Sequence, residues 1–116
     1  MVPPFDDLDL SQAKAFALQP RDLAELLVTV DDSLSQSLHH LLSTSDVQAL
    51  HRTLHDLKGY LGLVASASLT DLVAQADQAA RLGSLSQVLQ LLPPLMSRLA
   101  DLQTRLRAYQ AGIIDG

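Results

Sequence analysis

The sequence predicts an all-α protein, built as an antiparallel four-helix bundle with an additional short helix at its N-terminal end. Leucine, valine and alanine recur at steps of three and four residues, which is the spacing of one face of an α-helix. No stretch carries the signals of a β-strand. Loops of a few residues separate the periodic stretches, and short loops join antiparallel neighbours in helical bundles.

The first two expected helices follow an acidic lead-in over residues 1–7, which we expect to be flexible. Asp9 or Ser11 can cap a short first helix, which we expect to lie on the bundle as a lid. Pro20 suits the first turn of a long second helix, where its missing N–H costs nothing. The apolar stripe of this second helix comprises Leu23, Leu26, Leu27, Val30, Leu34, Leu38, Leu41 and Leu42.

A third helix is expected over about residues 46–66, after a polar cluster at 43–46 that both breaks and caps. Its apolar positions are Val47, Leu50, Leu54, Leu57, Leu61 and Val64. A fourth helix is expected to begin at Ser68 or Thr70 and to end at Gly83, since glycine commonly follows the last helical turn. Its inward positions are Leu69, Leu72, Val73, Ala76 and Ala80.

A fifth helix is expected over about residues 85–110. Its apolar stripe comprises Leu85, Val88, Leu89, Leu92, Leu95, Met96, Leu99, Leu102, Leu106 and Tyr109. Pro93 and Pro94 lie within it, and proline removes a helical hydrogen bond, so we expect them to kink the helix or split it. We expect Gly112 to end the helix and to leave a tail over residues 112–116.

The amino-acid composition limits the fold and the classes of function that this chain can have. The 116 residues are 47% hydrophobic, enough for the core of one helical domain, which we place at residues 8–111. Only 3% are aromatic, so the core must be aliphatic. The net charge of −5 and the lack of a basic run give nucleic-acid binding little electrostatic support.

Features that are missing from the sequence indicate the cellular compartment in which we expect the protein. There is no cysteine for a disulfide framework or a thiolate metal site. No apolar run approaches the roughly 20 residues of a membrane span, and the acidic start does not resemble a signal peptide. We therefore expect a cytoplasmic protein without membrane contact.

The most informative local feature is the run His-Asp-Leu-Lys-Gly at residues 55–59 of the third helix. Residues one turn apart share a helix face, so Lys58 places a cation beside His55, and Gly59 adds a position without a side chain. A neutral imidazole is a nucleophile, and a cation can offset the charge of a phosphoryl group. Helix periodicity turns His55, Gly59 and Arg52 away from the core and puts Lys58, His51 and Gly62 on its flanks.

The alternative interpretation is a solvated surface histidine beside a lysine, which leaves Gly59 unexplained, because a mid-helix glycine costs about 1 kcal/mol relative to alanine. His51 and His55 also have the i, i+4 spacing of half a zinc site. No third ligand accompanies them, so two solvated histidines are the better interpretation of that pair, and we expect no metal.

The run at residues 55–59 resembles the motif of histidine-containing phosphotransfer (HPt) domains, which reads His, any residue, an apolar residue, Lys and Gly. The resemblance covers roughly residues 20–105. Leu69 stands where the family has a leucine that opens the next helix. Residues 72–83 resemble the family's amphipathic helix, with an acidic residue and a closing glycine.

This resemblance implies a phosphotransfer protein or domain of a multistep His–Asp phosphorelay. The implied phosphoacceptor is His55, which exchanges a phosphoryl group with receiver-domain aspartates, while Lys58 steadies the group and Gly59 lets the partner approach. Such domains have no ATP site and no intrinsic catalysis. No cofactor is implied on this chain, and Mg²⁺ is expected on the receiver. The implied partners are response-regulator receivers, either separate or within a hybrid sensor kinase, and we expect a monomer.

Some positions depart from the family pattern. Asp56 replaces a small polar residue, Tyr60 stands where small residues are frequent, and Ala65 stands where glycine is common. We expect Tyr60 to pack into the bundle with its hydroxyl at the rim. The candidate partner-docking residues are Gly59, His51, Arg52, Asp56 and Gly62.

Two alternatives remain open at this point. One is a non-phosphorylated, HPt-like adaptor that binds a receiver or kinase without chemistry, to which Asp56 gives weight. The other is a plain dimerising bundle, which predicts a stable dimer and indifference to substitution of His55.

Overall fold

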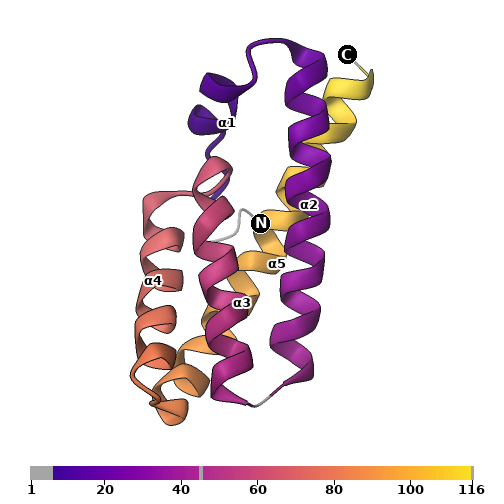
Figure 1. Ribbon diagram of the computed structural model, residues 1–116. Helices are drawn as coiled ribbons and strands as arrows, with labels where there is room; N and C mark the ends of the chain where they lie inside the picture. Colours follow the sequence, from indigo (N-terminus) through magenta and orange to yellow (C-terminus); the bar gives the residue numbers. More distant parts are fainter. Residues whose placement is uncertain (1–6, 45, 116) are drawn as a thin grey trace.

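Helices form nearly all of the part of the chain that this computed structural model describes, residues 7–44 and 46–115, with side chains through residue 112 (Figure 1). The elements are α1 (Ser11–Phe16), α2 (Pro20–Ser43), α3 (Val47–Tyr60), the 3₁₀ helix η1 (Leu61–Leu63), α4 (Ala67–Arg81) and α5 (Leu85–Asp115). The predicted all-α class is confirmed. Among the described helices, none combines the length and the apolar character that crossing a membrane requires.

The four long helices lie side by side, and successive ones run in opposite directions (Figure 1). Contacts join α2 to α3, α3 to α4, α4 to α5 and α5 back to α2. The short α1 packs against α2 and η1 at one end of the molecule. The core between the helices is aliphatic, as the composition predicts, and its largest fully buried side chains are Leu27, Leu34, Leu50, Leu54, Leu57, Leu61, Leu69, Leu95, Leu99, Leu102, Leu106 and Val64.

Two leucines of the predicted stripes lie outside this core. Leu42 and Leu89 are exposed, although they neighbour buried positions on α2 and α5. Consecutive apolar residues are 100° apart on a helix, so both members of an adjacent pair cannot face the centre of the core. In the pairs Leu41–Leu42 and Val88–Leu89, the first residue is the buried one.

Helix α3 positions the candidate site. Its N-cap is Asp46, whose Oδ2 accepts a hydrogen bond from the Ala49 N–H at 3.2 Å, as the polar cluster before it predicts. It ends at Tyr60, earlier than predicted, because η1 follows and residues 64–66 then pair with the segment at residues 7–9. The fully buried leucines of α3 orient the helix, so that the face with His55 points to solvent.

Helix α4 begins before the predicted start. Its N-cap is Ser66, whose Oγ accepts from the Leu69 N–H at 3.3 Å, and not Ser68 or Thr70. The Oγ of Ser68 accepts a hydrogen bond from Arg98 instead. The predicted end is confirmed, since Gly83 follows the last turn with φ +77°, a conformation that favours glycine.

Helix α5 is one helix through Pro93 and Pro94, so the predicted split is wrong. The prolines cannot donate to the carbonyls of Leu89 and Gln90, but all four residues are exposed, and water can serve the freed carbonyls there. The predicted end at Gly112 is also wrong, because α5 continues to Asp115. A glycine weakens a helix by about 1 kcal/mol without being a stop signal in itself.

A short segment before α1 pairs through its backbone with the residues that join η1 to α4. Leu8 and Ala65 form an isolated antiparallel bridge. The Asp9 N–H donates to the Val64 carbonyl at 2.8 Å, and the Ser66 N–H donates to the Asp7 carbonyl at 2.7 Å.

The carboxylate of Asp7 holds this segment in place. Arg98 of α5 donates to it twice, from Nε to Oδ2 at 2.9 Å and from Nη2 to Oδ1 at 2.7 Å. The Ser66 hydroxyl adds a third bond at 2.8 Å. The predicted lead-in over residues 1–7 is therefore wrong for Asp7, which is buried, while residues 1–6 lie outside the described part.

Replacement of Asp7 by Asn is expected to destabilise the fold by about 1.5–3 kcal/mol at neutral pH, the usual value of hydrogen bonds to a charged group. Hydrogen bonds from the Arg98 guanidinium lower the pKa of the Asp7 carboxyl. Because the folded pKa is the lower one, this contribution is complete above the unfolded pKa of about 3.9 and is lost as the pH falls through the folded pKa. Urea unfolding at pH 7 and at stepwise lower pH tests both statements.

The matched control is Asp9→Asn. The pKa of Asp9 is also lowered, by hydrogen bonds from Ser11, but its carboxylate is exposed and bonds only within its own turn. We expect that variant to unfold close to the wild-type midpoint. Equal midpoints for wild type and Asp7→Asn at pH 7 would contradict the assignment.

Candidate functional site

The exposed face of α3 carries the candidate phosphoacceptor. His55, Asp56, Lys58 and Gly59 are exposed, while Leu57 between them is fully buried. The exposure predicted for His55, Gly59 and Arg52 from the apolar stripe is confirmed. An imidazole in this position is open to a protein partner.

A buried carboxylate lies beside this face. Asp77 of α4 has a side chain only 8% exposed, and its Oδ2 lies 3.5 Å from Lys58 Nζ. Its Oδ1 lies 3.2 Å from His51 Nε2, which is within ion-pair distance. Yet Oδ1 is fully covered and has no hydrogen-bond partner among the described residues. Two basic side chains of α3, His51 and Lys58, thus lie beside one carboxylate of α4.

Asp77 is not among the site residues that the sequence pattern predicts. The sequence could have indicated that Asp77 is buried, because it lies among the inward positions of α4, next to Ala76 and one turn from Val73 and Ala80. An acidic residue on an apolar stripe needs basic or hydrogen-bonding partners. On α3 these are expected at i, i+3 and i+4 spacing along one face.

The rings of His51 and His55 lie one helical turn apart, with centroids separated by 6.1 Å and planes tilted by 48°. This places His51 between the candidate phosphoacceptor and the carboxylate of Asp77. Within residues 7–44 and 46–112, no group of three His, Cys, Asp or Glu side chains is arranged to hold a metal ion.

Gly59 and Gly62 form bare patches of the surface. A Cβ added to either residue would have no heavy atom within 4 Å. Neither has a positive φ, since Gly83 alone does so in the described chain. No close contact within the described fold therefore requires glycine at these two positions.

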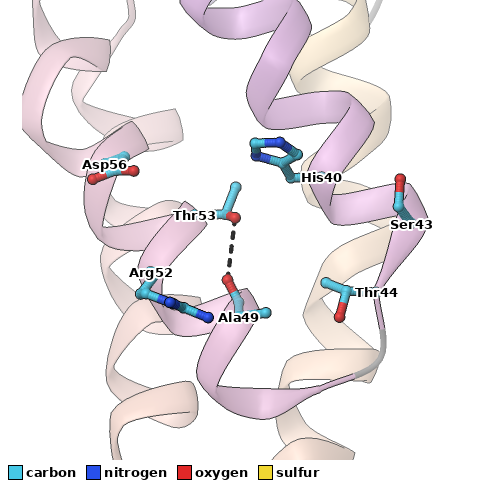
Figure 2. A pocket seen from close by; sticks show the side chains of 7 residues that line it. All are labelled: His40, Ser43, Thr44, Ala49, Arg52, Thr53 and Asp56. Atoms are coloured by element: carbon cyan, nitrogen blue, oxygen red, sulfur yellow. Dashed lines mark hydrogen bonds between the residues drawn. The ribbon is translucent and has the colours of Figure 1, made fainter.

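A hollow of about 350 Å³ opens between the C-terminal end of α2 and the start of α3 (Figure 2). Arg52 and Asp56 of α3 line it, opposite His40 of α2. The complete lining is His40, Ser43, Thr44, Ala49, Arg52, Thr53 and Asp56. Two of the predicted docking residues thus share this hollow with His40, whereas His51, Gly59 and Gly62 do not line it.

Tyr60 ties the end of α3 to α2. Its ring is half-buried, and its hydroxyl lies 2.9 Å from the Ser37 Oγ. Burial raises the pKa of the Tyr60 phenol, so it stays neutral at physiological pH. The expected packing of Tyr60 into the bundle is confirmed, and its hydroxyl contacts Ser37, a buried residue of α2.

These features define a class, namely helical bundles that present a histidine, a lysine and a glycine on one exposed helix face. A family model described as the Hpt domain matches residues 21–111, which is most of the chain. The chain belongs to the Hpt domain family, whose members carry out histidine phosphotransfer in two-component phosphorelays. Comparison with curated proteins and with solved structures found no match.

Proposed function

We propose that this chain relays a phosphoryl group between receiver-domain aspartates and that His55 carries it. The observation that carries the proposal is the exposed imidazole of a family member, with Lys58 one turn along the helix and Gly59 bare without any packing reason. In this proposal α2 to α5 serve as the family's antiparallel four-helix bundle, and α1 is an addition to it.

The chemistry needs one nucleophile on this chain. A neutral ring nitrogen of His55 attacks the phosphorus of a receiver's aspartyl phosphate. The N–P bond forms as the P–O bond breaks, and the aspartate leaves as a carboxylate with the bonding electrons. The imidazolium that results keeps its proton on the other ring nitrogen, and the reverse step passes the group to a second receiver.

Lys58 supports this step electrostatically. Its side chain is 52% exposed and extends from the turn that follows His55, where its charge offsets that of the phosphoryl oxygens. Mg²⁺ belongs to the receiver's own carboxylates in this proposal. The receiver docks over Gly59 and Gly62, with Arg52, Asp56 and His51 around them.

Incubation of the purified chain with a phosphorylated receiver tests the proposal. We expect an acid-labile, alkali-stable phosphate to appear on the chain as the receiver loses its label, because phosphohistidine has this stability. Several receivers should be tried, with folding verified by circular dichroism. A folded chain that takes no label from any of them would contradict the proposal.

One observation favours a second candidate, a non-phosphorylated adaptor. The exposed carboxylate of Asp56 follows His55 directly and adds negative charge where a phosphoryl group has to dock. An adaptor keeps its partner binding and its output when His55 is replaced by Gln. A phosphotransfer domain with the same substitution keeps the binding and loses the output.

A further inference from the structure

The two carboxylate oxygens of Asp77 differ in their hydrogen bonding. This carboxylate is nearly fully covered, and one of its two oxygens has no hydrogen bond. Burying a charge is costly unless it is paired, so Asp77 needs the cations beside it. Lys58 is a permanent one at Oδ2, whereas His51 at Oδ1 is a cation only when its ring is protonated.

Lys58 and a protonated His51 therefore share the charge of one carboxylate. When the His51 ring is neutral, Lys58 is the one full countercharge beside Asp77, and its ammonium is drawn toward α4. When His51 is protonated, the charge of Asp77 is shared, and Lys58 is freer to turn toward a phosphoryl group on His55. Lys58 has room for this movement, because its side chain is half exposed and its contact with Asp77 is long, at 3.5 Å.

We propose that His51 is a positioning residue which, through Asp77, sets how readily Lys58 reaches a phosphoryl group on His55. This inference rests on the proposed function. It gives His51 a task inside the chain, in addition to any contact with a partner, and it makes phosphoryl acceptance depend on the protonation of His51.

Other charged groups near the trio leave this assignment intact. From its own helix, His51 faces the ring of His55 at 6.1 Å, and from α4 it faces Asp77. Arg81, one turn beyond Asp77, forms no ion pair with it. Among the described residues, α2 and α5 bring no ionisable side chain within ion-pair distance of His51, Lys58 or Asp77.

The test uses a small phosphoryl donor, phosphoramidate, so that receiver docking does not enter. Acceptance by His55 is timed between pH 6 and pH 8 in wild type, His51→Gln and His51→Lys. The ratio of wild-type to His51→Gln rates removes the pH dependence that the two proteins have in common. We expect this ratio to be near one at pH 8 and to reach about three- to fivefold at pH 6, the factor that an ion pair of a half-exposed lysine allows.

His51→Lys supplies a permanent charge at the same position. It should exceed the wild-type rate at pH 8 by a similar factor and match it at pH 6. His39→Gln, an exposed histidine of α2, is the control and should follow wild type at every pH. A wild-type to His51→Gln ratio that does not change with pH would overturn the proposal.

A double-mutant cycle separates positioning through Asp77 from a direct effect of the His51 charge on the phosphoryl group. In an Asp77→Asn background, the differences between His51, Gln and Lys at position 51 should disappear. If they persist in full, His51 acts directly and the proposal is wrong. Circular dichroism verifies that each variant is folded, and Asp77→Glu should restore the dependence on position 51.

A measurement without phosphorylation distinguishes failure of the role proposed for His51 from failure of the proposed phosphotransfer function. By NMR of the unphosphorylated chain, the Lys58 side chain should gain mobility as the pH falls from 8 to 6 in wild type and stay unchanged in His51→Gln. Loss of this difference would overturn the role of His51 even if His55 accepts phosphate. If instead the difference is present and no variant is ever phosphorylated, the proposed function fails, and the coupling of His51 to Lys58 stands.

Discussion

Replacement of His55 by Gln is expected to abolish phosphoryl acceptance from a receiver while leaving the fold unchanged. Glutamine has no nucleophilic ring nitrogen, so no N–P bond can form. The side chain of His55 is exposed and has no hydrogen bond or ion pair to another described residue. Surface substitutions of this kind usually change the free energy of unfolding by less than about 0.5 kcal/mol.

The measurement is transfer of radioactive phosphate from a receiver, with chemical unfolding of each variant alongside. His39→Gln is the matched control, because it removes an exposed helical histidine away from the site and should label like wild type. Label on His55→Gln would show that another histidine is the acceptor. Label lost from a variant that is also unfolded would be set aside in favour of His55→Asn, which is smaller and equally polar.

The second large effect is expected at Gly59. A glutamine there should slow transfer from a receiver by about a hundredfold, the loss expected when a central contact worth roughly 2–3 kcal/mol becomes a clash. The same change should stabilise the helix by up to about 1 kcal/mol, since glycine is a poor helix former. The structure allows both results together, because a Cβ at this position would meet no heavy atom of the surrounding fold within 4 Å.

Gly112→Gln is the matched control for this prediction. Gly112 is also exposed, lies in the last turns of α5 and has the same open surroundings. It should gain stability without losing transfer. Equal transfer rates for Gly59→Gln and wild type would show that the receiver does not approach this part of α3, whereas slow transfer from phosphoramidate as well would point to damage at His55 itself.

The periodic part of this fold was accessible from sequence. Leucines at steps of three and four residues located α2 to α5 and oriented α3 correctly, so His55 was predicted on the solvent side and is found there. The element ends were less accessible. Ser66, and not Ser68, caps α4, because residues 64–66 pair with a segment almost sixty positions away, a contact without any local signal.

The same limit applies to the site. Local spacing brought His51, His55 and Lys58 together on one helix, because their separation is a property of that helix alone. Asp77 comes from α4, and only the packing of two helices decides which residues of α3 it meets. Gly59 looked unexplained in the sequence, and the structure sharpens that observation by showing that no internal contact accounts for it.

The pairing of Asp7 with Arg98 also affects the rate of unfolding that we expect for the bundle. Arg98 and Asp7 are separated by 91 positions, so their pairing encloses almost the entire chain. We expect it to form after the helices between them have associated, because closing so long a loop early is costly in entropy. An interaction that forms after the folding barrier does not speed folding, and it slows unfolding instead. We therefore expect the pair of Asp7 and Arg98 to slow the unfolding of the bundle rather than to speed its folding.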